Sequence, residues 1–197
     1  MTRLFLALIL AAASCAWAAP QLGQPAPDFT APDVAGKNVK LSDYRGKFVV
    51  LEWTNPDCPY VRRHYNSGNM PALQKELGAK DVVWLTVNST NQSSSEFKSP
   101  QQMAKWMSEK GGAPKATLID KESKVGRLYD ARTTPHMYVV DPQGKLIYAG
   151  AIDDKRWNTE AGTKNANNHV RAALGEAMAG KPVSVASTSP YGCTVKY

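Results

Sequence analysis

Cysteine is scarce in this 197-residue chain, which contains Cys15, Cys58 and Cys193. Three cysteines are too few for a small domain held together by a disulfide framework. Neither glycine (14 residues) nor proline (13 residues) reaches the share found in collagen or in low-complexity disordered chains. Hydrophobic residues at 43% and charged residues at 21% match ordinary globular proteins. We therefore expect one globular domain, or at most two small ones, with a sizeable core.

Dense clusters of basic residues are also missing. The chain has 24 Lys and Arg against 17 Asp and Glu, a formal net charge of +7, but no five-residue window is mainly basic. Nucleic-acid-binding surfaces gather their lysine and arginine on one face or along one helix. We therefore expect no nucleic-acid partner, and solubility is sufficient to explain the positive charge.

No apolar run reaches the roughly 20 residues that a helix needs to cross a bilayer. The apolar run at residues 4–13 follows one cation, Arg3, and precedes small residues that end at Ala18, as in a secretory signal peptide. We interpret residues 1–18 as a signal peptide and expect a periplasmic or secreted mature protein without an integral membrane span. Cleavage after Ala18 would remove Cys15, whose lipidation is the alternative.

Apolar runs and helical periods alternate along the rest of the chain. Strands are expected at residues 47–53, 81–88 and 116–120 and as a hairpin over 136–152, and helices at 59–78, 99–107, 123–131 and 165–179. Residues 20–36 are expected to form an extended arm. This order predicts an α/β fold with a central mixed sheet and helices on both faces. The expected domain is residues 19–180, followed by an extended tail, residues 181–197.

Cys58 follows a predicted buried strand and precedes a predicted helix that begins with Pro59. Free backbone N–H groups and the helix dipole at such a start stabilise a negative charge, so a cysteine there forms the nucleophilic thiolate readily. Arg62 and Arg63 add positive potential if they face the sulfur, whereas Asp57 opposes it. Cys58 is therefore the candidate nucleophile, and an inert cysteine or a structural half-cystine is the alternative.

Cys193 lies on the tail, directly after the flexible Gly192. Two thiols that remain in an exported chain tend to pair, and a tail cysteine can resolve an intermediate formed on Cys58. The alternative is a purely structural disulfide between Cys58 and Cys193, because closing the long loop between them stabilises a fold by about 5 kcal/mol in the chain-entropy estimate. The sequence leaves both readings of the pair open.

Several of these features occur together in one superfamily. The arm sequence GQPAPDF, the strand ending in Trp53, the helix start at Cys58 and the segment RTTPHMYVVDPQGKL resemble the thioredoxin superfamily. More narrowly, the chain is similar to the redoxin group, which spans peroxiredoxin-like and exported thioredoxin-like proteins. The resemblance covers about residues 20–180 and implies a thioredoxin-like fold.

The resemblance also implies site residues. In that family the proline matching Pro135 is cis and lies against the reactive sulfur, and the backbone of the preceding residue, here Thr134, binds the substrate chain. The chain departs from the family at other positions. Val61 replaces the second cysteine of the thioredoxin Cys-x-x-Cys motif, and Leu51 and Asn55 replace a Pro and a Thr or Ser of peroxiredoxins.

Two histidines are further candidates. His136 directly follows Pro135 and could transfer protons at the thiolate. Together with Cys58 and Met137, it would also permit a soft-metal site. His64 follows Cys58 by six residues, which rotates it by about 240° around an ideal helix. We therefore expect His64 to face away from the sulfur, at the surface.

These observations favour an oxidoreductase of the thioredoxin or peroxiredoxin type. In this interpretation Cys58 attacks a disulfide or a peroxide, and Cys193 or an external thiol resolves the intermediate. The expected partners are a thiol or disulfide protein substrate or a peroxide, together with an external thiol reductant; no cofactor is expected. The alternative is a non-enzymatic module that binds a metal through Cys58 and His136, or a redox-inactive scaffold with a structural bridge.

Overall fold

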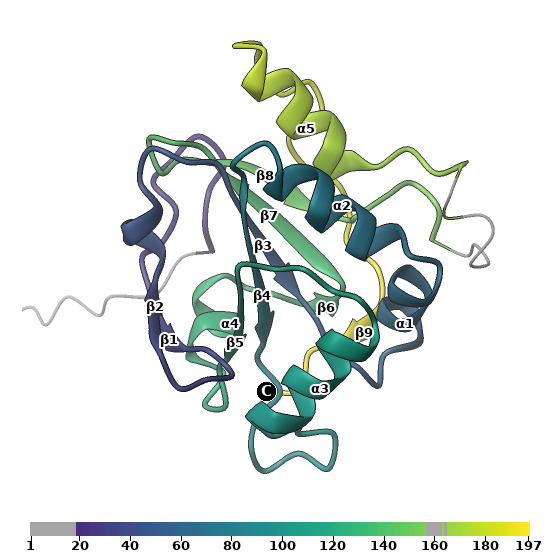
Figure 1. The fold of residues 1–197 in the computed structure, drawn as a ribbon. Coiled ribbons are helices and arrows are strands. Elements are labelled where there is room, and N and C mark those ends of the chain that lie inside the picture. Colours follow the sequence, from purple (N-terminus) through teal and green to yellow (C-terminus); the bar gives the residue numbers. More distant parts are fainter. Residues whose placement is uncertain (1–18, 157–162, 164) are drawn as a thin grey trace, which may run out of the picture.

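A mixed five-stranded sheet forms the centre of the computed structural model, which describes residues 19–156, 163 and 165–197 (Figure 1). The expected signal peptide and Cys15 lie outside the described residues. The strands follow the order β5-β4-β3-β7-β8. They are β3 (Val49–Trp53), β4 (Val83–Asn88), β5 (Ala116–Ile119), β7 (His136–Val140) and β8 (Leu146–Gly150). β3, β4 and β5 run parallel, whereas β7 is antiparallel to β3 and to β8. The α/β fold with a central mixed sheet is thus confirmed.

Helices pack against both faces of this sheet. They are α1 (Pro59–Asn66), α2 (Asn69–Gly78), α3 (Pro100–Glu109), α4 (Lys124–Leu128) and α5 (His169–Met178). Helices α1, α2 and α5 cover one face, and α3 joins them through Met107. Helix α4 and the pair β1 (Thr30–Pro32) and β2 (Asn38–Lys40) cover the other face, with the 3-10 helix η1 (Leu41–Tyr44) (Figure 1). Each face therefore has its own apolar core, as the alternation of side chains along the strands requires.

Local sequence explains where the helices begin. Ser99 accepts a hydrogen bond from the N–H of Gln102, and the Gln102 side chain accepts one from the N–H of Ser99, which fixes the start of α3. The segment 59–78, expected as one kinked or split helix, forms α1 and α2, with Gly68 at φ +76° between them. Helix α5 is shorter than expected because Asn168 caps it.

The expected extended arm, residues 20–36, contains strand β1. This strand pairs with β2, which the sequence analysis did not predict. The two strands have three residues each, and a single residue of each is buried. Such short strands carry little periodic signal, so their pairing is determined by packing on the sheet rather than by local sequence.

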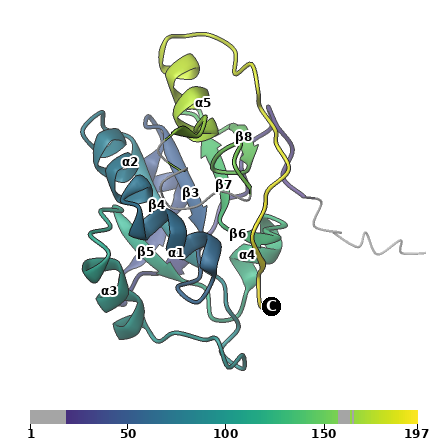
Figure 2. The same ribbon diagram turned by 90° about the vertical axis from the view of Figure 1, so that its right-hand side faces the viewer.

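The tail returns from α5 along the edge of the sheet. Figure 2 shows it in yellow, passing β8 and reaching β6 (Thr133–Thr134). Ser187 forms a parallel bridge with Ala149 of β8. Further on, β9 (Cys193–Thr194) pairs antiparallel with β6. Within the described ranges, no helix combines the length and the apolar character that a membrane span requires.

Candidate active site

Cys58 occupies the N-cap position of α1, with Pro59 at the first helical position. Its backbone N–H donates to the carbonyl oxygen of Asn55 at 3.0 Å. The thiol is almost completely buried, at 2% relative exposure, and donates to the carbonyl oxygen of Thr134 at 3.0 Å. The strand-to-helix turn thus directs the sulfur toward the backbone of β6.

The same backbone segment also holds the second thiol. The peptide bond between Thr134 and Pro135 is cis, as the resemblance implies. In the register of β6 and β9, Thr134 lies opposite Cys193. Thr134 therefore contacts Cys58 through its carbonyl and pairs with Cys193 through its strand, and both thiols are free.

The surroundings of Cys193 raise the pKa of its thiol. Burial, together with a hydrogen bond to Cys58 and an electrostatic interaction with it, raises the pKa of Cys193 to about 12. Cys193 is consequently protonated at neutral pH. Burial is the largest of these causes, and the next two both come from Cys58. The protonation of Cys193 is therefore coupled to the state of the Cys58 sulfur.

Polar residues next to Cys58 connect it to a loop and to the tail. The Asn55 side chain accepts from the N–H of Asp57 at 2.9 Å and donates to Glu96 at 2.9 Å. Glu96 forms an ion pair with Lys196 of the tail at 3.3 Å. Asp57, whose charge opposes a thiolate, is paired with Lys98. Asn55, at the position of the peroxiredoxin Thr or Ser, therefore holds the turn and the loop before α3 in place.

The two other predicted supporting residues, Arg62 and His136, lie in different surroundings. Arg62 is exposed, and its backbone N–H donates to the carbonyl of Cys58 at 2.9 Å. His136 is buried, and its Nδ1 lies 3.2 Å from the hydroxyl of Tyr138, a member of the core on the α4 side. Cys58 and Met137 belong to the core on the opposite face. Strand alternation therefore directs His136 away from Cys58.

This placement separates the residues of the soft-metal alternative. His136 is on the α4 side, and burial lowers its pKa to about 4. In the part of the chain that the structure describes, no group of three or more His, Cys, Asp or Glu side chains is arranged to hold a metal ion. Cys58, His136 and Met137 do not come together as a ligand set.

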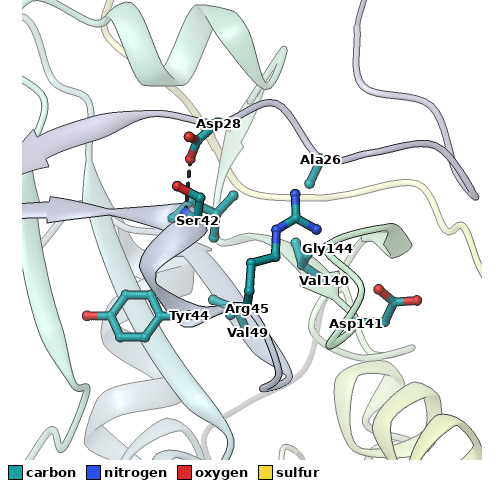
Figure 3. A pocket seen from close by; sticks show the side chains of 10 residues that line it. Ala26, Asp28, Ser42, Tyr44, Arg45, Val49, Val140, Asp141 and Gly144 are labelled. Atoms are coloured by element: carbon teal, nitrogen blue, oxygen red, sulfur yellow. Dashed lines mark hydrogen bonds between the residues drawn. The ribbon is translucent and has the colours of Figure 1, made fainter.

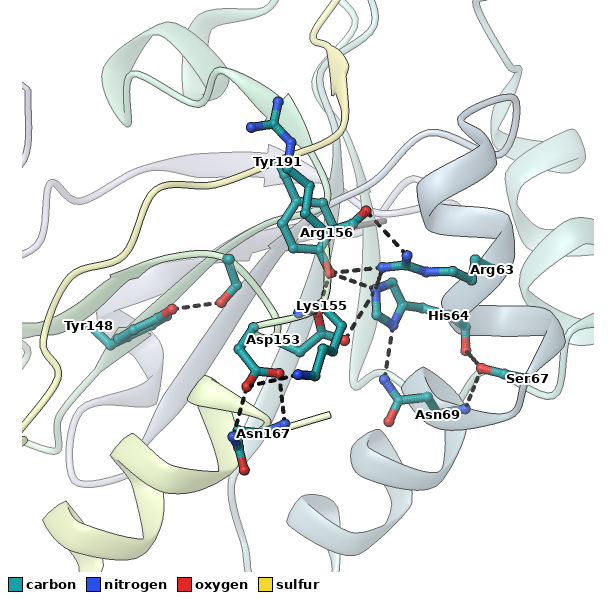
Figure 4. A network of polar contacts seen from close by, with 12 residues as sticks. Arg63, His64, Ser67, Asn69, Tyr148, Asp153, Lys155, Arg156, Asn167 and Tyr191 are labelled. Carbon is teal, nitrogen blue, oxygen red and sulfur yellow. Dashed lines mark hydrogen bonds and ion pairs between the residues drawn. The ribbon is translucent and has the colours of Figure 1, made fainter. Parts of the chain in front are cut away.

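The expectation that His64 lies at the surface is wrong. His64 is completely buried, and its Nδ1 lies 2.9 Å from the side-chain nitrogen of Asn69 (Figure 4). Burial and the neighbouring Arg63 guanidinium lower the pKa of His64 to about 3, so the ring is uncharged at neutral pH. The His64 ring contacts Arg63, Asn69 and Tyr191. The tail, with Tyr191, covers the helix there.

Sequence reasoning also missed a buried carboxylate. Glu52 of β3 is 0% exposed and lies on the same sheet face as the Cys58 core. Its oxygens accept hydrogen bonds from the side chains of Tyr65, Gln74, Trp84 and Thr86. Burial raises the pKa of Glu52 to about 7 despite these donors. A single acidic residue inside an apolar run was the available signal.

A small hollow lies at the other end of the sheet. It has room for about 10 Å³ and is lined by side chains that include Asp28, Ser42 and Arg45 (Figure 3). A water molecule needs about that volume. Val49 and Val140, which pair at one end of β3 and β7, line this hollow. Trp53 and His136 pair at the opposite end of these strands, four residues away, and Cys58 follows that end of β3. The hollow is therefore no substrate pocket for the cysteines.

Solved structures resemble this fold over most or part of the chain. An uncharacterized conserved protein from Geobacillus kaustophilus matches with a TM-score of 0.78 and 29% identity, over 90% of this chain and 92% of that chain. A thiol:disulfide interchange protein DsbE, so described, from Chlorobium tepidum has a TM-score of 0.53 and 24% identity, over 66% and 85% of the two chains. The second likeness concerns the fold alone, and the fold of this chain is thioredoxin-like.

Curated relatives match the sequence over its central part. The thiol-disulfide oxidoreductase ResA of Geobacillus thermodenitrificans is 29% identical over 132 residues, which are 64% of this chain and 66% of that protein, just under two thirds. The thioredoxin-like protein YneN of Bacillus subtilis is 31% identical over 137 residues, which are 68% and 75% of the two chains. The AhpC/TSA family model matches residues 22–149, well over half of the chain. This protein belongs to the AhpC/TSA family.

Proposed function

We propose that this protein is an exported thiol-disulfide oxidoreductase with Cys58 as its nucleophile and Cys193 as its resolving thiol. The pairing of β9 with β6 carries the proposal, because it sets Cys193 opposite Thr134. The carbonyl oxygen of Thr134 accepts a hydrogen bond from the Cys58 thiol. In this proposal residues 19–180 form the redoxin domain and residues 181–197 supply the second thiol. The relatives named as thiol-disulfide oxidoreductases support the reaction class.

The proposed reaction has two exchange steps. The Cys58 thiolate attacks one sulfur of a substrate disulfide, forms a mixed disulfide and releases the other substrate sulfur as a thiolate. Cys193 then attacks the Cys58 sulfur, its proton passes to solvent or to the departing thiolate, and the second substrate thiol leaves. The substrate gains two electrons, and the protein ends with a Cys58–Cys193 disulfide. An external dithiol reduces this disulfide and completes the cycle.

A peroxide is the second candidate substrate. The family match and the burial of Cys58, which favours a small oxidant, support it. In that case the Cys58 thiolate takes one peroxide oxygen to become a sulfenic acid, and the remaining fragment leaves as an alcohol or water after protonation. Cys193 attacks the sulfenic sulfur, releases water and forms the same disulfide.

The test is stoichiometric oxidation of the reduced, full-length protein. One equivalent of oxidised glutathione, or of hydrogen peroxide in a parallel sample, is added before peptide mapping without reductant. We expect a Cys58–Cys193 disulfide that dithiothreitol reverses, formed faster with glutathione disulfide if disulfides are the substrate class and faster with hydrogen peroxide if peroxides are. In a Cys58→Ser control, Cys193 should remain largely unmodified. Modification of Cys193 in preference to Cys58 would overturn the assignment of roles.

Export supplies the compartment in which this chemistry would operate. The short apolar run before Ala18 supports cleavage there, so we expect the mature protein to begin at Ala19. Mass spectrometry of the protein recovered from the periplasm or the medium of an expressing bacterium measures this terminus. An uncleaved N-terminus on protein that stays in the cytosol would contradict the proposal.

A further inference from the structure

Tyr191 anchors the tail two residues before Cys193. It is 4% exposed, and its hydroxyl lies between a cation and an anion (Figure 4). The hydroxyl accepts a hydrogen bond from Arg63 Nη2 at 2.9 Å and donates to Asp153 Oδ1. His64 Nε2 lies 3.1 Å from the same oxygen. Hydrogen bonds to charged groups are the strong ones, so this hydroxyl is a firm attachment point.

Two of the three side chains that contact the Tyr191 hydroxyl lie on the same helix as the nucleophile. Cys58 caps α1, and Arg63 and His64 lie farther along the same helix. The Arg63 guanidinium carbon lies 5.6 Å from the centre of the Tyr191 ring, which adds an attraction through the ring face. Because a helix holds its residues at fixed separations, α1 sets the distance between the Tyr191 anchor and the Cys58 sulfur.

The chain between the anchor and the second thiol has little freedom. Two residues span at most about 7 Å, so anchoring Tyr191 confines Cys193 to the neighbourhood of β6. Gly192, between them, has a φ of +136°, and a Cβ there would overlap the carbonyl oxygen of Thr134. The absence of a side chain at Gly192 thus lets the tail press against the carbonyl that holds the Cys58 thiol.

We propose that Tyr191 is a positioning residue for disulfide closure. Its hydroxyl, held by Arg63 and Asp153, fixes the tail so that Cys193 meets the Cys58 sulfur at a high effective concentration, and Gly192 permits the close approach. This inference rests on the proposed function, since it concerns how quickly and how favourably the Cys58–Cys193 disulfide forms.

The test is the equilibrium of the full-length Tyr191→Phe variant with mixtures of reduced and oxidised glutathione. The ratio of oxidised to reduced protein gives the effective concentration of Cys193 toward Cys58. We expect the variant to show a value lower than wild type by roughly tenfold, because a hydroxyl held by two charged groups is lost. A purely structural role would lower the melting temperature but leave this effective concentration unchanged, and that result would overturn the inference.

Closure kinetics provide a second readout. Methyl methanethiosulfonate converts Cys58 to a mixed disulfide with a methylthio group. Attack by Cys193 on the Cys58 sulfur then releases methanethiol at a measurable rate. Tyr191→Phe should slow this release. Gly192→Ala, which leaves the anchor intact, should slow it as well by displacing the tail from Thr134; an unchanged rate in Gly192→Ala would contradict the proposed close approach.

Tyr129→Phe is the matched control. It removes a hydroxyl that donates to the carbonyl of Pro27 on the other sheet face, so it should leave the effective concentration at the wild-type value. If wild-type protein forms no Cys58–Cys193 disulfide at any glutathione ratio, both the proposed function and this inference are overturned. If wild type forms it and Tyr191→Phe matches wild type, the inference about Tyr191 alone fails.

Discussion

Cys193→Ser protein should attack its substrate once and then stop. Cys58 keeps its helix N-terminus and its contact with Thr134, so the first exchange step proceeds. Without the second thiol, the mixed disulfide or sulfenic acid on Cys58 has to wait for an external thiol. A correctly held internal thiol acts at a very high effective molarity, so we expect turnover at millimolar glutathione to fall by at least roughly a hundredfold.

Turnover assays and intact-mass spectrometry measure this effect together. The spectrum should show the Cys58 adduct accumulating in Cys193→Ser but not in wild type. Thr194→Ser, which alters the neighbouring exposed residue of β9, is the matched control and should behave as wild type. If Cys193→Ser turned over normally and the oxidised wild type were instead more stable by about 5 kcal/mol, the bridge would be structural.

Glu52→Gln should change how stability depends on pH. The pKa of Glu52 is about 7 in the folded protein and near 4.5 in an unfolded chain, so the folded state binds this proton more tightly. The stabilisation from Glu52 is therefore fully present below pH 4.5 and is lost as the pH rises to 7. Glutamine stays neutral throughout and can bond the same neighbours. The free energy of unfolding of the variant, relative to that of wild type, should therefore rise by about 3 kcal/mol between pH 4.5 and pH 7.

The measurement is the free energy of unfolding in urea at a series of pH values. His64 and His136 have lowered pKa values and so oppose Glu52 in the wild-type profile, since their contribution is lost as the pH falls below 6.5. They are present in both proteins, so the difference isolates Glu52. Gln101→Ala, which changes an exposed residue of α3 without a titratable group, should give a difference that does not vary with pH. A pH-independent difference for Glu52→Gln would show that its carboxyl titrates normally.

Local signals in the sequence were sufficient for the order of the main elements. Ser99 and Pro100 mark the start of α3, and Pro59 places Cys58 at the start of α1, because caps and first-turn residues act within a few positions. The turn at residues 141–144 likewise separates β7 from β8. These features depend on backbone hydrogen bonds between near neighbours, which a single sequence displays.

Contacts between distant segments could not be inferred in the same way. His64 was placed at the surface because helical rotation says which way a side chain points, but not what covers it. The tail supplies Tyr191 from 127 positions farther along the chain. Glu52 was overlooked because its four hydrogen-bonding partners come from α1, α2 and β4. The pairing of Cys193 with Thr134 depends on where a two-residue strand docks, and two residues carry no periodicity.

The route of the tail also has a consequence for the order of folding. Strand β9 reaches β6 only after β7, β8 and α5 have intervened, and contacts across such long separations form late because the loop entropy must be overcome first. The chain can thus complete the central sheet and α1 before its last residues dock. During that interval Cys58 lacks the cover of the tail and is open to stray disulfides and oxidants. Docking of the final segment then ends this vulnerable period.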